Sequence, residues 1–278
     1  MADFPANHDE AQTPHEHVGA KCDLARHHGE DVVCVDDVSF AYQGKPALER
    51  IQLHVQRGST LGIIGPNGSG KTTLLKLMLG LLAPDSGRVE ILGMSPREAC
   101  ARGNLIGYVP QRHELDWTFP VSVRQVVELG LAGEDGLTGR PSRTQRSRAT
   151  ELLGAVGMAD VADDPIGELS GGQQQRVFIA RALVAGPRIV ILDEPMTGID
   201  QGAQESLMGL LEQAKAQMGL TLVMVSHNLR SIIACCDQLA CLNRTLHYHD
   251  RPAGLSRETL LHVFQCDVDA MLDAHLHE

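Results

Sequence analysis

The chain is poor in aromatic residues, in basic residues and in long apolar runs. Only 3% of its 278 residues are aromatic, with a single tryptophan. Lysine and arginine number 24 against 35 acidic residues, giving a net charge of −11, so we expect no nucleic-acid partner. Because 18 apolar residues never run together and the first residues lack a signal-peptide pattern, we expect the chain to be neither secreted nor membrane-spanning.

The cysteines show no spacing that is typical of a metal site or a disulfide framework. The seven cysteines are an odd number and include no C-x-x-C pair, which suits a reducing compartment better than a disulfide framework. Cys235, Cys236 and Cys241 could ligate a metal ion. Free cysteines more often pack as small apolar side chains, so we interpret these three as packed thiols.

The order of patterns along the chain predicts an α/β fold. Residues 1–30 are polar and hold five of the 13 histidines, so we interpret them as a flexible tail. Short runs rich in β-branched residues follow from Asp31, and helical spacing dominates about 112–168, which we predict to be a helical insert. Strands and helices then alternate, which favours a mainly parallel sheet. Residues 251–278 show helical spacing and end in a second histidine-containing tail.

The strongest local motif is GPNGSGKT, which fits G-x-x-x-x-G-K-[ST] between a predicted strand and a predicted helix. Its glycines allow backbone N–H groups to converge on phosphate oxygens at the N-terminus of the helix. Lys71 is predicted to reach the β- and γ-phosphates, and Thr72 to ligate Mg²⁺. The predicted nucleotide-binding residues of this segment are Gly65, Pro66, Asn67, Gly68, Ser69, Gly70, Lys71, Thr72 and Thr73.

The run RIVILDEP supplies an acidic pair that fits the same site. Its apolar residues predict a strand buried on both faces, and Asp193 follows at the carboxyl end, where ligands bind in open α/β sheets. We expect Asp193 to hold Mg²⁺ and Glu194 to be the general base for the attacking water. The two motifs together predict a P-loop ATPase or GTPase.

LSGGQQQR, at Leu169–Arg176, separates these two possibilities. Physically, Ser-Gly-Gly before a helix is an N-cap that could also cradle an anion. In sequence it resembles the signature motif of the ATP-binding cassette (ABC) ATPases. The remaining motifs of that family follow in order: FAYQG, the P-loop, YVPQR, the signature, ILDEP, GID and SHN. The additional site residues that this resemblance implies are Tyr42 for adenine stacking, Gln111 for Mg²⁺, Ser170, Gly171, Gly172 and Gln173 for nucleotide, Asp200, and His227 as a catalytic switch.

The resemblance spans about residues 31–250 and implies an ABC ATPase domain. Its expected fold is a P-loop NTPase with a RecA-like mixed or parallel sheet core, an N-terminal antiparallel β subdomain and an inserted α-helical subdomain. ATP and Mg²⁺ are the expected ligands, with Glu194, His227 and Lys71 catalytic. The signature of one protomer is expected to act on ATP held by the other, which implies a homodimer.

The segment PQRHELDWTFP and the following VSVRQVVELG resemble the subgroup of these ATPases that energises zinc and manganese uptake, as does SRETLLHVFQ near the C-terminus. The resemblance implies membrane permease subunits, a periplasmic or surface solute-binding protein, and a peripheral location on the cytoplasmic face of the bacterial inner membrane. Trp117 and Phe119 are expected either to meet the permease or to pack inside the helical insert. The alternatives are an iron-chelate or efflux transporter ATPase, or a soluble ABC ATPase outside transport.

Histidine gathers at the two ends of the chain, which is a weaker pointer to metal. Neutral imidazole is a favoured ligand of zinc and related ions. The hypothesis is that the tails sense or buffer metal, with plain solvated tails as the alternative because no fixed ligand spacing is present. The sequence leaves open whether Zn²⁺, Mn²⁺ or Fe²⁺ is carried.

Overall fold

A computed structural model describes residues 31–111, 121–132, 141–226 and 229–264. Among these residues, none of the helices has the length and apolar character needed to cross a bilayer. The strands are β1 (Asp31–Tyr42), β2 (Lys45–Gln56), β3 (Thr60–Ile64), β4 (Ser86–Ile91), β5 (Ile106–Val109), β6 (Ile189–Asp193), β7 (Thr221–Val225), β8 (Gln238–Asn243) and β9 (Thr245–Asp250). The α-helices are α1 (Lys71–Met78), α2 (Pro96–Ala101), α3 (Val123–Glu128), α4 (Arg143–Ala155), α5 (Gly171–Leu183), α6 (Gln201–Met218), α7 (Leu229–Ile233) and α8 (Arg257–Phe264).

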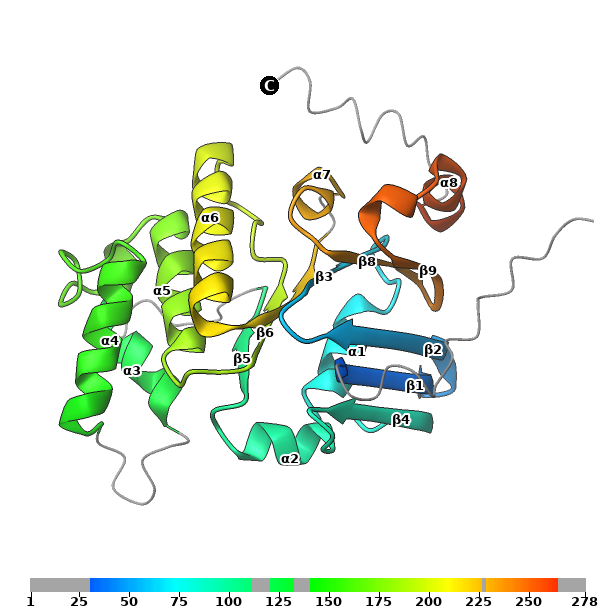
Figure 1. Cartoon of the computed structure of the whole chain (residues 1–278), viewed down its shortest axis with the longest axis horizontal. Helices are drawn as coiled ribbons and strands as arrows, with labels where there is room; N and C mark the ends of the chain where they lie inside the picture. Colours follow the sequence, from blue (N-terminus) through cyan, green and yellow to red (C-terminus); the bar gives the residue numbers. More distant parts are fainter. Residues whose placement is uncertain (1–30, 112–120, 133–140, 227–228, 265–278) are drawn as a thin grey trace, which may run out of the picture.

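The strands form two sheets, as the α/β prediction requires. The larger sheet has the order β5-β6-β7-β3-β8-β9, parallel throughout except for the antiparallel pair β8–β9. The smaller sheet, β2-β1-β4, is antiparallel. Figure 1 shows it at the opposite side of the molecule from helices α3 and α4. The fold is the predicted mixed core with an antiparallel subdomain and a helical one.

The central strands are buried on both faces, which explains their almost continuous apolar sequences. On β6, Ile189 and Ile191 pack in the apolar cluster shared by α1 and the antiparallel sheet. Their neighbours Val190 and Leu192 pack on the other side, in the cluster formed with α5 and α6. The sheet therefore separates two cores and holds the carboxyl ends of β3 and β6 rigidly.

The helices of the predicted insert pack on a helix that follows it. Helices α3 and α4 lie within 112–168, but both pack on α5, which begins at Gly171. Helix α4 begins at Arg143, because Ser142 caps it through a capping box with Gln145.

The cysteines of the described residues form no disulfide. Cys241 on β8 is fully buried, and Cys235 and Cys236 pack partly buried against the same apolar cluster. Burial raises the pKa of the Cys241 thiol to about 12. These three cysteines are thus packed thiols, as the sequence interpretation predicts.

Candidate functional site

The P-loop connects the end of β3 to the start of α1. Gly70 caps the helix with a φ of 101°, a conformation that favours glycine. At Gly65 an added Cβ would lie 2.0 Å from the Leu242 carbonyl oxygen, so only glycine fits there. The Ser69 hydroxyl is buried and has no hydrogen-bond partner among the described residues. An unpartnered polar group beside a helix N-terminus is suited to binding an anion.

Lys71 is buried at the first position of α1 and holds the loop from inside. Its Nζ donates to the carbonyl oxygens of Gly65 at 2.7 Å and Pro66 at 2.9 Å. Burial lowers the pKa of Lys71, while Glu194 and Asp193 act to raise it. The ammonium therefore lies between the loop and two carboxylates.

The two predicted acids are brought to the same place. Asp193 ends β6 and Glu194 follows it, with exposed fractions of 4% and 8%. Burial raises the pKa of Asp193, and the neighbouring Glu194 raises it further. Such a buried acidic pair fits a divalent cation, which would offset the repulsion between them.

The backbone at Glu194 is in an unusual conformation. Its φ is 52°, in the left-handed region, and its N–H donates to the Val225 carbonyl at 2.9 Å. The Thr197 hydroxyl donates to Glu194 Oε2 at 3.3 Å. Positive φ at a non-glycine residue costs free energy and gathers at functional sites, where the surrounding structure holds it.

A cavity of about 450 Å³ joins these parts. Its lining contains most of the predicted nucleotide site: Tyr42, Asn67, Gly68, Ser69, Gly70, Lys71, Thr72, Thr73, Gln111, Asp193 and Glu194. Tyr42 is 45% exposed and stands edge-on to Phe40 at 4.9 Å between ring centroids, so its ring is available for stacking.

Sequence reasoning missed several lining residues, among them Lys45 and Arg244. Arg244 lies in the β8–β9 turn, where its N–H donates to Ser69 O and its own carbonyl accepts from Glu49 N–H. The turn thereby ties the P-loop to β2. No local sequence signal gives this contact, because it depends on how β8 and β9 pair.

The signature residues lie outside this cavity. Ser170 caps α5, accepting from Gln173 N at 3.4 Å, while Gln173 Oε1 accepts from Ser170 N at 2.9 Å. Gly171 is exposed, and the nearest atom to a Cβ added there would be the Gly198 carbonyl oxygen at 3.8 Å. Asp200 is also outside the cavity, where its carboxylate caps α6.

Other predicted residues fall outside the described part of the chain. These are His227, Trp117, Phe119 and the histidine-containing ends, 1–30 and 265–278. Of the C-terminal extension, α8 is described, with Leu260 and Val263 buried against the core.

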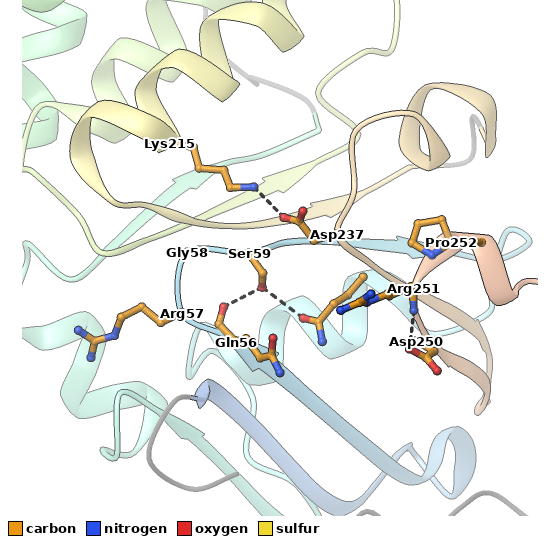
Figure 2. A pocket seen from close by; sticks show the side chains of 11 residues that line it. Gln56, Arg57, Gly58, Ser59, Lys215, Asp237, Asp250, Arg251 and Pro252 are labelled. Carbon is orange, nitrogen blue, oxygen red and sulfur yellow. Dashed lines mark hydrogen bonds and ion pairs between the residues drawn. The ribbon is translucent and has the colours of Figure 1, made fainter.

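A larger cavity of about 640 Å³ lies elsewhere and holds none of the predicted site residues. Figure 2 shows its polar lining, with Lys215 reaching Asp237 and Ser59 contacting Gln56. The Lys215–Asp237 distance is 2.7 Å, so this charge is already paired. The P-loop cavity is therefore the better candidate site.

The family model for ABC transporters matches residues 48–197, a stretch that contains the P-loop, the signature and the acidic pair. The chain belongs to the ABC transporter family. Within it, the chain is an ATP-hydrolysing ATPase of the cassette fold. The match extends over more than half of the sequence.

Among curated proteins, the chain is similar in sequence to ATP-binding proteins of metal transport systems. It is 45% identical to the manganese transport system ATP-binding protein MntB of Bacillus subtilis over 71% of this chain and 77% of that one. It is 42% identical to the zinc transport system ATP-binding protein TroB of Treponema pallidum over 76% and 78%. The zinc import ATP-binding protein ZnuC of Pseudomonas fluorescens is 37% identical over 81% and 78%.

Solved structures agree on the fold. CbiO1 of Clostridium perfringens, part of the ABC transporter complex cbiONQ, is similar with a TM-score of 0.72 and 28% identity, covering 84% of this chain and 94% of that one. The cassette MJ0796, in a dimeric post-hydrolysis state bound to ADP and Pi, has a TM-score of 0.69 and 30% identity, covering 80% and 100%.

Proposed function

We propose that this chain is the ATPase subunit of an importer for a divalent metal, Zn²⁺ or Mn²⁺. The observation that carries the proposal is the similarity to manganese and zinc transport ATP-binding proteins along most of both chains. The cavity supports it with a phosphate loop, a buried lysine and a buried acidic pair. Residues 31–250 would form the ATPase domain, preceded by the tail 1–30 and followed by the extension 251–278.

The cavity fits a Mg²⁺-bound nucleoside triphosphate. The predicted roles are adenine stacking for Tyr42, phosphate binding for the P-loop residues 65–73, and Mg²⁺ ligation for Thr72, Gln111 and Asp193. Thr72 is exposed beside the buried Asp193, and both line the cavity. Mg²⁺ would neutralise charge on the β- and γ-phosphates. Lys71 would exchange its two carbonyl partners for phosphate oxygens.

Glu194 is the proposed general base. Its carboxylate lies beside Asp193 at the carboxyl end of β6, held by the Thr197 hydroxyl and a strained backbone. From there it would accept the proton of the water that attacks the γ-phosphate in line. His227, outside the described residues, is proposed to contact the γ-phosphate.

We infer that two copies complete the site. In one chain the P-loop lines the cavity and the signature does not. Ser170, Gly171, Gly172 and Gln173 would close over the γ-phosphate held by the partner, with Asp200 at the same interface. The likeness to a dimeric cassette supports this arrangement.

Coupling to membrane permease subunits is proposed through the chain that follows Gln111. Gln111 lines the nucleotide cavity just after β5, and Trp117 and Phe119 follow within a few residues. A large ring that follows Gln111 closely in the chain could transmit nucleotide state to a permease. The protein would then work peripherally at the cytoplasmic face of the bacterial inner membrane, with a solute-binding protein acting indirectly.

The test is metal uptake by the reconstituted transporter. Vesicles holding the permease and this ATPase should take up radioactive zinc or manganese only when ATP is supplied. Glu194→Gln vesicles provide the matched control, since they bind ATP without hydrolysing it. ATP-dependent uptake of neither metal would reject the metal-import proposal in favour of another ABC transporter.

A further inference from the structure

A group of metal-ligating side chains lies at the end of the β1–β2 hairpin far from the nucleotide cavity. The hairpin turn pairs Tyr42 with Lys45, both of which line that cavity. At the other end, ligand atoms of Asp31, Cys34 and His54 all lie within 4.8 Å of one another. Nothing in the ATPase mechanism uses these three side chains.

A break in the strand register brings them together. Cys34 pairs with His54 across the sheet, and these two side chains share one face. Asp31 would normally point to the opposite face from Cys34, because it lies three residues away. The register shift between Asp31 and Val33 pairs Asp31 with Gln56. Gln56 lies two residues from His54 on β2, so the Asp31 carboxylate lies on the same face of the sheet as His54.

The distances suit a small cation. Asp31 Oδ2 lies 3.5 Å from His54 Nδ1, which is buried and has no hydrogen-bond partner among the described residues. Two ligands held about 2.0–2.3 Å from one tetrahedral ion stand roughly 3.3–3.8 Å apart. Asp31 and His54 already match this spacing, and the Cys34 thiol lies within 4.8 Å of both ligand atoms.

The other imidazole nitrogen of His54 has a carboxylate near it, as metal-bound histidines commonly do. His54 Nε2 lies 3.5 Å from Asp36 Oδ1, the arrangement in which a carboxylate orients a ligating histidine. Asp36 in turn accepts from Arg88 Nε at 3.0 Å, which fixes that carboxylate. A protonated His54 bridging two acids is the alternative arrangement.

The surroundings are negative. Burial is the largest cause that raises the pKa of the Cys34 thiol, to about 11. The negative charges of Asp31, Asp36 and Glu90 raise this pKa further, and the positive charge of Arg88 lowers it. Burial also favours a neutral, metal-free thiol until a cation binds the sulfur and displaces its proton to solvent. Gln56, the cross-strand partner of Asp31, is exposed and lines the larger cavity of Figure 2, so this cavity lies beside this end of the sheet.

We propose that Asp31, Cys34 and His54 form a Zn²⁺ site in the antiparallel sheet, separate from the transported metal and from the Mg²⁺ of ATP. One oxygen, one sulfur and one nitrogen ligand are the mixed set that Zn²⁺ binds, with a fourth position left for water. Binding releases the thiol proton of Cys34. The site goes beyond the transport function and does not depend on it.

The test is Co²⁺ titration of the metal-stripped full-length protein, because a thiolate ligand gives Co²⁺ a near-ultraviolet charge-transfer band that imidazoles do not. Cys22 and Cys266 are replaced by serine in every protein compared, so that the two tails offer imidazoles alone. The band should appear in the wild type and in Cys100→Ser, whose thiol is half-buried away from the cluster. It should disappear in Cys34→Ser. Zn²⁺ should displace the cobalt and abolish the band.

Two further variants keep the test independent of folding defects. His54→Gln should weaken the Co²⁺ affinity. Asp36→Asn, which removes the orienting charge and its ion pair with Arg88 but none of the three proposed ligands, should weaken it about 10–100-fold. Both should bind ATP as the wild type does. A wild type without the band, or a band that survives Cys34→Ser, would overturn the proposal and leave His54 as an ion-pairing residue.

Discussion

The chain contains two glycine-rich turns, each at the N-terminus of a helix, and they are built in different ways. In the P-loop, Gly65 and Gly70 are closely surrounded, and an added Cβ would lie 2.0 Å and 2.6 Å from the nearest atom. In the signature turn, Gly171 and Gly172 have no neighbour closer than 3.5 Å to such a Cβ. The first turn is held by its own chain, whereas the second is open.

This difference supports the proposal that a single chain supplies only the P-loop half of each site. Close packing at Gly65 and the Arg244 contact to Ser69 preorganise the P-loop for phosphate. Nothing in their own chain lies close enough to require glycine at the two signature positions. The reason that we propose for these glycines is a second copy closing over ATP.

Replacing the proposed general base, Glu194, should have the largest effect on ATP hydrolysis. In Glu194→Gln, ATP binding should persist, while hydrolysis falls by about 10²–10⁴-fold because the amide cannot accept the proton. Phosphate release and nucleotide binding measure the two quantities, and light scattering should detect a trapped dimer. Glu205→Gln, an exposed acid on α6, is the control. Rapid turnover in Glu194→Gln would remove Glu194 as base.

A methyl group added at Gly65 in the P-loop should lower the stability of the protein. Gly65→Ala should destabilise the protein by about 1–3 kcal/mol, because its Cβ meets the Leu242 carbonyl, and should weaken ATP binding as well. Thermal unfolding and nucleotide titration report both. Gly209→Ala on α6, where nothing lies within 4 Å, should be neutral or stabilising. Equal stability of the two variants would contradict the packing account.

A glycine-to-alanine change in the signature turn should lower ATP hydrolysis without lowering stability. Gly172→Ala meets Ala203 at an ordinary 3.5 Å, so the unfolding temperature and ATP affinity should stay unchanged. Hydrolysis should fall by about 10–100-fold, because the methyl group holds the two copies apart at the γ-phosphate. A loss of stability like that of Gly65→Ala would show that the two turns do not differ.

The smallest effect on the isolated ATPase is expected from Trp117→Ala. We expect its folding and its ATP hydrolysis to match the wild type, while ATP-driven metal uptake in vesicles is lost. Circular dichroism, phosphate release and uptake are the three measurements. Failure to fold would instead favour packing of Trp117 inside the helical subdomain.

Much of the cavity could be predicted because its residues follow strand ends. Lys71 and Asp193 are marked by motifs directly after apolar strands, and parallel strands bring such ends together. Ser170 was different: its local pattern indicates an N-cap, which it is, and only the family resemblance assigns it a nucleotide. Spacing could not show that it lies away from the cavity of its own chain.

The parts that escaped prediction depend on pairing between distant segments. The strands β8 and β9 are short, and their turn brings Arg244 to the P-loop only after the sheet has formed. The cluster at Cys34 requires a register shift that no local signal marks. Helix α2 does carry a local signal, the capping box of Ser95 and Glu98, although the elements predicted from the sequence do not include it.

Mixing two inactive variants tests the central claim, that each ATP site needs two chains. Lys71→Ala removes the phosphate contact, and Gly171→Glu places a carboxylate at the exposed signature, where it would repel the γ-phosphate. In a mixed dimer, the intact P-loop of the Gly171→Glu chain faces the intact signature of the Lys71→Ala chain, so one of the two ATP sites is complete. Random pairing makes about half of the dimers mixed, so an equimolar mixture should recover about one quarter of wild-type hydrolysis. A mixture no more active than the separate variants would contradict the claim.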